Sequence, residues 1–102
     1  MLNGKKILLI IGGGIAAFKC HDLIRGLREA GASVTPVLTE AGKEFVTPLS
    51  ISVLSGSKVY ADLFDLEDET QMGHIELSRN SDLIVIVPAT ADLLAKMASG
   101  LA

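Results

Sequence analysis

The stretch ILLIIGGGIAAFK, residues 7–19, carries most of the information about the fold. Ile7 to Ile11 form a continuous aliphatic run between lysines and glycines, which is typical of a parallel strand buried on both faces. Apolar residues then recur on one stripe at helical spacing, namely Ala16, Cys20, Leu23, Ile24 and Leu27. Gly31 stands where a left-handed helix C-cap belongs. The stretch therefore predicts a buried strand, a glycine turn and an amphipathic helix in succession.

The chain beyond Gly31 continues this alternation. Val34 to Leu38 has the composition of a second strand, and Leu83 to Val87 that of another strand that is fully buried. The other predicted segments are one or two short helices around Pro48 within residues 41–55, a short strand at Val59-Tyr60, an acidic solvated loop over residues 62–71 and a helix over residues 91–102. Strands alternating with helices predict a parallel sheet with right-handed crossovers.

Two features of the chain depart from that pattern. Pro36 removes a hydrogen-bond donor from the second strand, which favours an edge or bulged position. Four candidate strands are few for this architecture, and the last predicted helix runs to the final residue. We therefore expect residues 1–102 to be one α/β domain that is incomplete at its C-terminus.

Composition excludes several classes of function. The net charge is −3 and basic residues form no runs, which argues against nucleic-acid and anionic-membrane partners. Cys20 is the single cysteine, which excludes an internal disulfide and suits a reducing compartment. It falls on the apolar stripe, so a packed thiol is expected rather than a redox partner. Lys5-Lys6 and the apolar run resemble a secretory signal, but glycines interrupt the run, so we expect a cytoplasmic protein.

The glycine turn predicts a phosphate site. Glycines between a buried strand and a helix let a phosphate approach the backbone, and the free N–H groups of the helix start favour an anion. The spacing Gly12-x-Gly14-x-x-Ala17 fits a dinucleotide fingerprint, in which Glu40 would hold the ribose. Thr39 offers a hydroxyl instead, which suits a mononucleotide phosphate. Spacing alone leaves both ligands open.

A third segment follows the strand over residues 83–87. It begins with Pro88, and Thr90 and Asp92 are both of N-cap type. Ligands of open α/β sheets bind at the carboxyl ends of the strands. The glycine turn, Thr39 and Pro88 to Ala91 are all expected at that edge. No metal site is predicted.

Four segments together resemble a known family. GGGIAAFK (12–19), LTEAGKEFVTPLS (38–50), MGHIELSR (72–79) and PATADLLAKMASGLA (88–102) occur in this order and spacing in the flavin-containing cysteine decarboxylases. Within that family the chain most resembles the N-terminal half of the bacterial bifunctional phosphopantothenoylcysteine decarboxylase/phosphopantothenate–cysteine ligases. The resemblance implies a Rossmann-like, flavodoxin-type three-layer fold, FMN as cofactor, and trimers, often four to a dodecamer, with FMN at the subunit interface.

The resemblance also implies roles for individual residues. The FMN phosphate would be held by Gly13, Gly14, Ile15 and Thr39. The flavin would be lined by Pro88, Ala89, Thr90 and Ala91, where threonine replaces a serine of related decarboxylases, as in the bacterial bifunctional branch. His74 matches the active-site histidine, and an imidazole can exchange protons near neutral pH. His21 carries no such support and is expected at the surface.

The implied reaction is the FMN-dependent decarboxylation of 4'-phosphopantothenoylcysteine to 4'-phosphopantetheine in coenzyme A biosynthesis. Three alternatives remain. The first is a flavin prenyltransferase, which shares the fold but lacks GHIELSR. The second is an NAD-binding module, which would use Gly12 to Ala17 with Glu40. The third is a non-catalytic assembly subunit. The family's later substrate-gripping segment and lid cysteine do not occur in residues 1–102, so full turnover by this chain alone is not expected.

Overall fold

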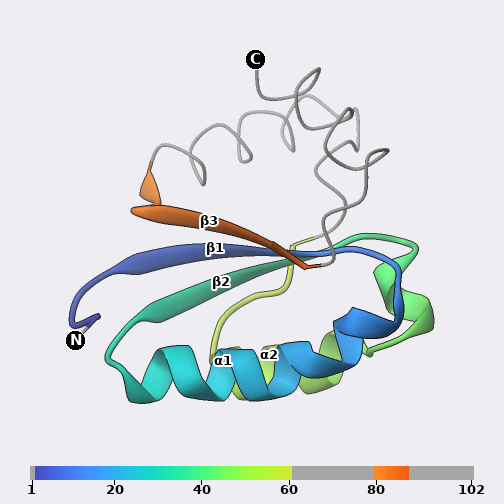
Figure 1. Cartoon of the computed structure of the whole chain (residues 1–102), viewed down its shortest axis with the longest axis horizontal. Coiled ribbons are helices and arrows are strands. Elements are labelled where there is room, and N and C mark those ends of the chain that lie inside the picture. Colours follow the sequence, from blue (N-terminus) through green and yellow to red (C-terminus); the bar gives the residue numbers. More distant parts are fainter. Residues whose placement is uncertain (1, 61–79, 88–102) are drawn as a thin grey trace.

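The computed structural model describes residues 2–60 and 80–87, which contain a parallel sheet with helices on one face (Figure 1). The described sheet has three strands in the order β2-β1-β3. β1 (Lys6–Ile11) lies in the centre, between β2 (Ser33–Leu38) and β3 (Leu83–Val87). Ile11 pairs with Leu38 on one side and with Val87 on the other. The expected parallel α/β sheet is confirmed.

Burial of β1 follows from its central position. Ile7 to Ile11 are all at most 2% exposed, as the unbroken aliphatic run predicts. Leu9 and Ile11 belong to the core cluster that includes Ile24 of α1 and Ile51 of α2. Burying such side chains contributes about 1.5–3 kcal/mol each, so β1 anchors the fold.

The helical segment after β1 begins differently from the prediction. Ile15–Lys19 form a 3₁₀ turn, η1, and the α-helix α1 then spans Cys20–Glu29. Because a 3₁₀ turn has fewer residues per turn than an α-helix, the stripe starts one residue later, and Ala17 is buried while Ala16 is only half-buried. The rest of the apolar stripe agrees with the prediction, and Cys20 is fully buried in the core.

Gly31 ends α1 as the sequence predicts. Its φ is +99°, and its N–H donates to the Arg28 carbonyl at 2.9 Å. The N–H of Ala32 donates to the Leu27 carbonyl at 3.0 Å. These two bonds form a Schellman motif, which satisfies carbonyls that the helix end would otherwise leave without donors.

Pro36 occupies the outer side of β2. The N–H of Tyr60 donates to the Pro36 carbonyl at 3.0 Å, and Leu38 donates to the Tyr60 carbonyl at 2.9 Å. The missing N–H of Pro36 therefore faces away from β1 and removes no bond from the central ladder. The predicted edge position is confirmed. The expected short strand at Val59-Tyr60 is a single parallel bridge between Tyr60 and Val37.

Residues 41–55 form two short helices, as expected. η2 spans Gly42–Glu44, and α2 spans Pro48–Ser55. Thr47 caps α2, because its side-chain oxygen accepts a hydrogen bond from the Ser50 N–H at 3.1 Å. Pro48 occupies the first turn, where its missing N–H costs nothing. α1 and α2 lie on the same face of the sheet (Figure 1).

β3 is a strand, but the prediction that it is fully buried is wrong. Leu83 is 53% exposed, and the residues from Val85 to Val87 are half-buried. The reason is position, because β3 has one strand neighbour among the described residues whereas β1 has two. The predicted loop over residues 62–71 and helix over residues 91–102 lie outside the described residues, as would a second helical layer built from them.

Candidate functional site

The carboxyl ends of β1 and β2 bring two turns together. Since Ile11 and Leu38 are register partners, the Gly12–Gly14 turn and the turn from Thr39 to Gly42 start side by side. Both lie at the edge where open α/β sheets bind ligands. Three predicted phosphate-binding residues, Gly13, Gly14 and Ile15, thus lie at the same edge as Thr39.

The start of η1 presents free backbone donors. Gly14 is the N-cap residue, with φ 153° and ψ 159°, a conformation that favours glycine, and it provides no side-chain cap. The first intrahelical bond of this segment runs from the Ala17 N–H to the Gly14 carbonyl at 2.9 Å. Among the described residues, no acceptor bonds the N–H groups of Ile15 and Ala16. Such donors at a helix start suit an anion, and Ile15 is 79% exposed there.

Gly13 meets a different requirement. A Cβ added at this position would lie 2.6 Å from the Ala41 Cβ and 3.2 Å from the Ala41 carbonyl. The glycine therefore permits close packing of the two turns. From sequence, the alternative to a phosphate site at these glycines is a tight turn with close packing, and Gly13 shows such packing.

Thr39 is buried, and its hydroxyl has two partners within the protein. The hydroxyl donates to the Ile11 carbonyl at 3.1 Å and accepts from the Gly42 N–H at 3.1 Å. A hydroxyl has one hydrogen to donate, so a bond to a phosphate would require it to leave Ile11. The Ile11 carbonyl would still accept the Thr39 backbone N–H at 3.0 Å. Phosphate binding by Thr39 thus stays a prediction.

The acidic candidate for a ribose contact forms an ion pair. The Glu40 carboxylate accepts a hydrogen bond from Lys43 Nζ at 3.0 Å, and both side chains are exposed. Gly12 at the same edge donates its N–H to the Val87 carbonyl at 2.8 Å, which ties the glycine turn to the end of β3. The chain passes from Val87 into the predicted flavin-lining segment. His74, Pro88, Ala89, Thr90 and Ala91 themselves lie outside the described residues.

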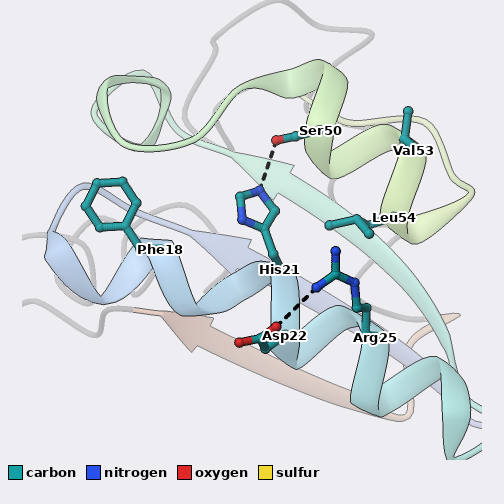
Figure 2. Close-up of a pocket in the computed structure, with 7 residues that line it drawn as sticks. All are labelled: Phe18, His21, Asp22, Arg25, Ser50, Val53 and Leu54. Atoms are coloured by element: carbon teal, nitrogen blue, oxygen red, sulfur yellow. Dashed lines mark hydrogen bonds and ion pairs between the residues drawn. The ribbon is translucent and has the colours of Figure 1, made fainter.

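A groove separates α1 from α2 on the helical side of the molecule (Figure 2). Its volume is about 550 Å³, and it is lined by Phe18, His21, Asp22, Arg25, Ser50, Val53 and Leu54. His21 Nε2 lies 3.0 Å from the Ser50 hydroxyl, whose own hydrogen bonds the Thr47 carbonyl at 3.0 Å. His21 lies at the surface groove, as the prediction of a surface position allows, but its side chain is half-buried and links two helices.

Cys20 is a packed thiol, as expected. It is fully buried, and burial raises the pKa of its thiol to about 11. A thiol with that pKa stays protonated near neutrality and is a poor nucleophile. Among the described residues, no group of three or more His, Cys, Asp or Glu side chains could hold a metal ion. Within residues 2–60 and 80–87, no helix has the length and apolar character that a bilayer crossing requires.

Comparisons with a family model, with curated proteins and with solved structures give consistent matches. The model of the family described as Flavoprotein matches residues 1–102. The coenzyme A biosynthesis bifunctional protein CoaBC of Vibrio vulnificus is 57% identical over 100 residues, which are 98% of this chain and 25% of that protein. The chain therefore spans about a quarter of the length of the curated relatives it matches.

Solved structures agree with the fold. The FMN-dependent cysteine decarboxylase SpaF superposes with a TM-score of 0.77 at 28% identity, over 100% of this chain and 59% of that chain. A PPC decarboxylase variant complexed with pantothenoylaminoethenethiol gives 0.67 at 29% identity, over 96% and 54%. The parallel sheet and these matches give the chain the flavodoxin-type α/β fold implied by the resemblance.

Proposed function

Because this chain belongs to the Flavoprotein family, we propose that it binds FMN at the carboxyl edge of its sheet and forms part of a phosphopantothenoylcysteine decarboxylase. The substrate would be 4'-phosphopantothenoylcysteine, and the product 4'-phosphopantetheine, in coenzyme A biosynthesis. The CoaBC relatives and the FMN-dependent decarboxylase structures support this reaction over the other functions of the fold.

The observation that carries the proposal is that no described residue accepts a hydrogen bond from the N–H groups of Ile15 and Ala16. They lie at the exposed start of η1, directly after the glycine turn, and a phosphate is the anion that such a site favours. Lys43 is already paired with Glu40, so the nearby backbone rather than that cation would stabilise the phosphate. Gly13, Gly14 and Ile15 would hold the phosphate, and Thr39 would join them if its hydroxyl turns from Ile11.

The chemistry is divided between cofactor and protein. When bound, FMN supplies the oxidising equivalents that cysteine decarboxylation needs and takes them back at the end. His74 would move a proton at the substrate, and Pro88, Ala89, Thr90 and Ala91 would line the flavin. The Cys20 thiol takes no part, because it is buried and its pKa is raised to about 11.

We propose that the native protein is a cytoplasmic homo-oligomer built from trimers, with a dodecamer of four trimers as the larger form. Exposed apolar side chains support self-association: Ile15, Phe18, Leu49 and Val53 are all more than half exposed. An apolar surface of this kind is usually covered by another subunit or a ligand. A monomer in light scattering at micromolar concentration would contradict the oligomer.

The direct test of the function is a flavin titration followed by an assay. We expect the purified protein that carries this chain to bind FMN, to quench its fluorescence, and to release carbon dioxide from phosphopantothenoylcysteine. NAD should not compete with FMN. Failure to bind FMN, or competition by NAD at similar concentration, would overturn the proposal in favour of the dinucleotide alternative.

A further inference from the structure

We propose that the turn from Thr39 to Gly42 positions the Gly12–Gly14 turn, and that Ala41 is its positioning residue. We call this segment the brace. Ala41 sets the direction of the N–H groups at Ile15 and Ala16, which have no acceptor among the described residues, without touching the ligand itself. The part of the proposal that concerns FMN rests on the proposed function, whereas the contact between the two turns stands on the structure alone.

The first support is the fit of Ala41 against Gly13. A Cβ at Gly13 would approach the Ala41 Cβ to 2.6 Å, a distance that non-bonded carbons do not adopt, and the Ala41 backbone to 3.2 Å. Ala41 has ordinary helical φ and ψ angles of −65° and −35°, so it is held there without strain. The Ala41 methyl therefore occupies the space that a side chain at Gly13 would need.

The second support is the pair of hydrogen bonds of the Thr39 side chain. Its hydroxyl connects the end of β1, through the Ile11 carbonyl, to the Gly42 N–H within the brace. Gly42 is itself buried, and a Cβ there would lie 2.6 Å from the Ile11 carbonyl oxygen. The brace thus lies directly against the last residue of β1, with no room for a displacement toward it.

The third support comes from beyond the turns. Phe18 of η1 packs edge-to-face on Phe45, which follows η2, with ring centroids 5.7 Å apart. Such aromatic pairs stabilise a contact beyond the effect of the area that they bury. The glycine turn and η1 are therefore held against residues 39–45 at both ends, and Figure 1 shows the two segments together beyond the ends of β1 and β2.

These contacts predict a compensating pair of substitutions. Gly13→Ala should push the glycine turn away from the brace, because a packed site has no space for an added methyl group. Ala41→Gly removes the atom at 2.6 Å and leaves contacts at 3.2 Å, which small shifts can relieve. The double variant should therefore recover most of what the single Gly13→Ala variant loses.

The experiment measures FMN affinity by fluorescence and the melting temperature of the flavin-free protein for both single variants and the double variant. Gly13→Ala should weaken FMN binding by about tenfold to a hundredfold and lower the Tm by about 5–10 °C. The double variant should bind within about threefold of a protein that carries Ala41→Gly alone, and its Tm should recover in parallel. Gly26→Ala is the matched control, since a Cβ at Gly26 meets no atom within 4 Å.

Each outcome decides the proposal. Additive effects of the two substitutions on Tm would overturn the proposal. A double variant that stays as poorly folded as Gly13→Ala would also overturn it. A recovered Tm without recovered FMN affinity would show contact but no positioning, which also overturns it. If Gly13→Ala fails to fold and the double variant folds, that rescue supports the brace. If the parent protein binds no FMN, the proposed function fails, and so does the role of the brace in ligand binding. The comparison of Tm values still tests the contact between Gly13 and Ala41.

Discussion

The described loops at the amino ends of the strands are bonded to one another, whereas at the carboxyl ends the N–H groups of Ile15 and Ala16 have no acceptor among the described residues. At the amino edge, Asp82 and Lys6 exchange two bonds of 2.7 Å, and Ser33 donates to the Lys5 carbonyl at 2.9 Å. At the carboxyl edge, no described residue accepts from the N–H groups of Ile15 and Ala16. The groups named at the amino edge are thus hydrogen-bonded within the protein, whereas the carboxyl edge can receive an anion.

Glycines show the same contrast. Gly31 at the amino edge has a positive φ and completes a helix end, so its role is entirely in folding. Gly13 at the carboxyl edge allows two turns to pack, and Gly14 sets the conformation in which η1 begins without a side-chain cap. The difference shows that the role of a glycine depends on the residues that it contacts and on its position in the sheet. Substitutions should therefore separate stability from ligand binding according to the edge they touch.

The largest effect is expected for catalysis. In the protein that carries this chain, the proposed function predicts that His74→Asn retains FMN yet loses about 10²–10⁴-fold in carbon dioxide release, because asparagine cannot exchange a proton near neutrality. The measurement is single-turnover decarboxylation alongside the flavin absorbance of the purified variant. Turnover within a few-fold of the parent would make His74 a bystander, and loss of flavin would make it structural.

At the amino edge, Gly31→Ala should damage folding and spare binding. Its φ of +99° is unfavourable for alanine, and the added Cβ would collide with the Asn3 side chain. We expect unfolding free energy to fall by about 2–4 kcal/mol, the sum of backbone strain and overpacking. Urea denaturation measures the loss. FMN affinity of the folded fraction should not change, and a weakened affinity would break the separation of the two edges.

A smaller effect is expected at Thr39, whose hydroxyl donates to the Ile11 carbonyl at the end of β1 and accepts from the Gly42 N–H. Thr39→Val should weaken FMN binding by about 1–2 kcal/mol, because it leaves the Gly42 N–H without its acceptor and removes one donor from the edge. Thr39→Ser should restore the affinity, since it keeps the hydroxyl. The amino-edge control is Ser33→Ala, which removes an exposed hydroxyl whose bond to Lys5 is 3.4 Å long. Fluorescence titration measures the FMN affinity of the three variants. An affinity of Thr39→Val equal to that of the parent protein would show that Thr39 is not part of the site.

The smallest effect is expected between the two edges, in the middle of α1. Gly26 is exposed and has ordinary helical geometry, and an added Cβ meets nothing. Gly26→Ala should raise stability by about 0.5–1 kcal/mol through helix propensity, with unchanged FMN affinity. Thermal unfolding and the same titration provide the check. Destabilisation would mean that this face of α1 is covered by another subunit.

Sequence patterns predicted those features of the fold that depend on one residue type or on a short run of residues. The aliphatic run of β1, the C-cap at Gly31 and the outer position of Pro36 each follow from a rule about one residue type. The shift of the buried stripe to Ala17 could not be predicted, because a 3₁₀ turn and an α-turn leave the same apolar pattern. The exposure of Leu83 depends on which strands flank β3, and the sequence of β3 does not contain that information.

The candidate site was predictable in its location but not in its internal contacts. Strand ends and glycines placed Gly13 to Ile15 and Thr39 at one edge. Ala41 was missed, since an alanine in a turn carries no chemical signal and its role appears only in its distance from Gly13. The bond between His21 and Ser50 was missed for a different reason, because the two residues are 29 positions apart and only the fold brings them together.

Hydrogen exchange of backbone amides, compared between the FMN-loaded and the flavin-free protein, tests the contrast between the two edges most directly. FMN should slow exchange at Ile15 and Ala16, whose N–H groups have no acceptor among the described residues. Exchange at Gly31 and Ala32, whose N–H groups are already bonded to α1, should not change. Protection confined to residues 13–16 and their neighbours at the carboxyl edge is the predicted result. Unchanged exchange at Ile15 and Ala16 with FMN bound, or equal protection at the amino edge, would contradict the assignment of the phosphate to the glycine turn.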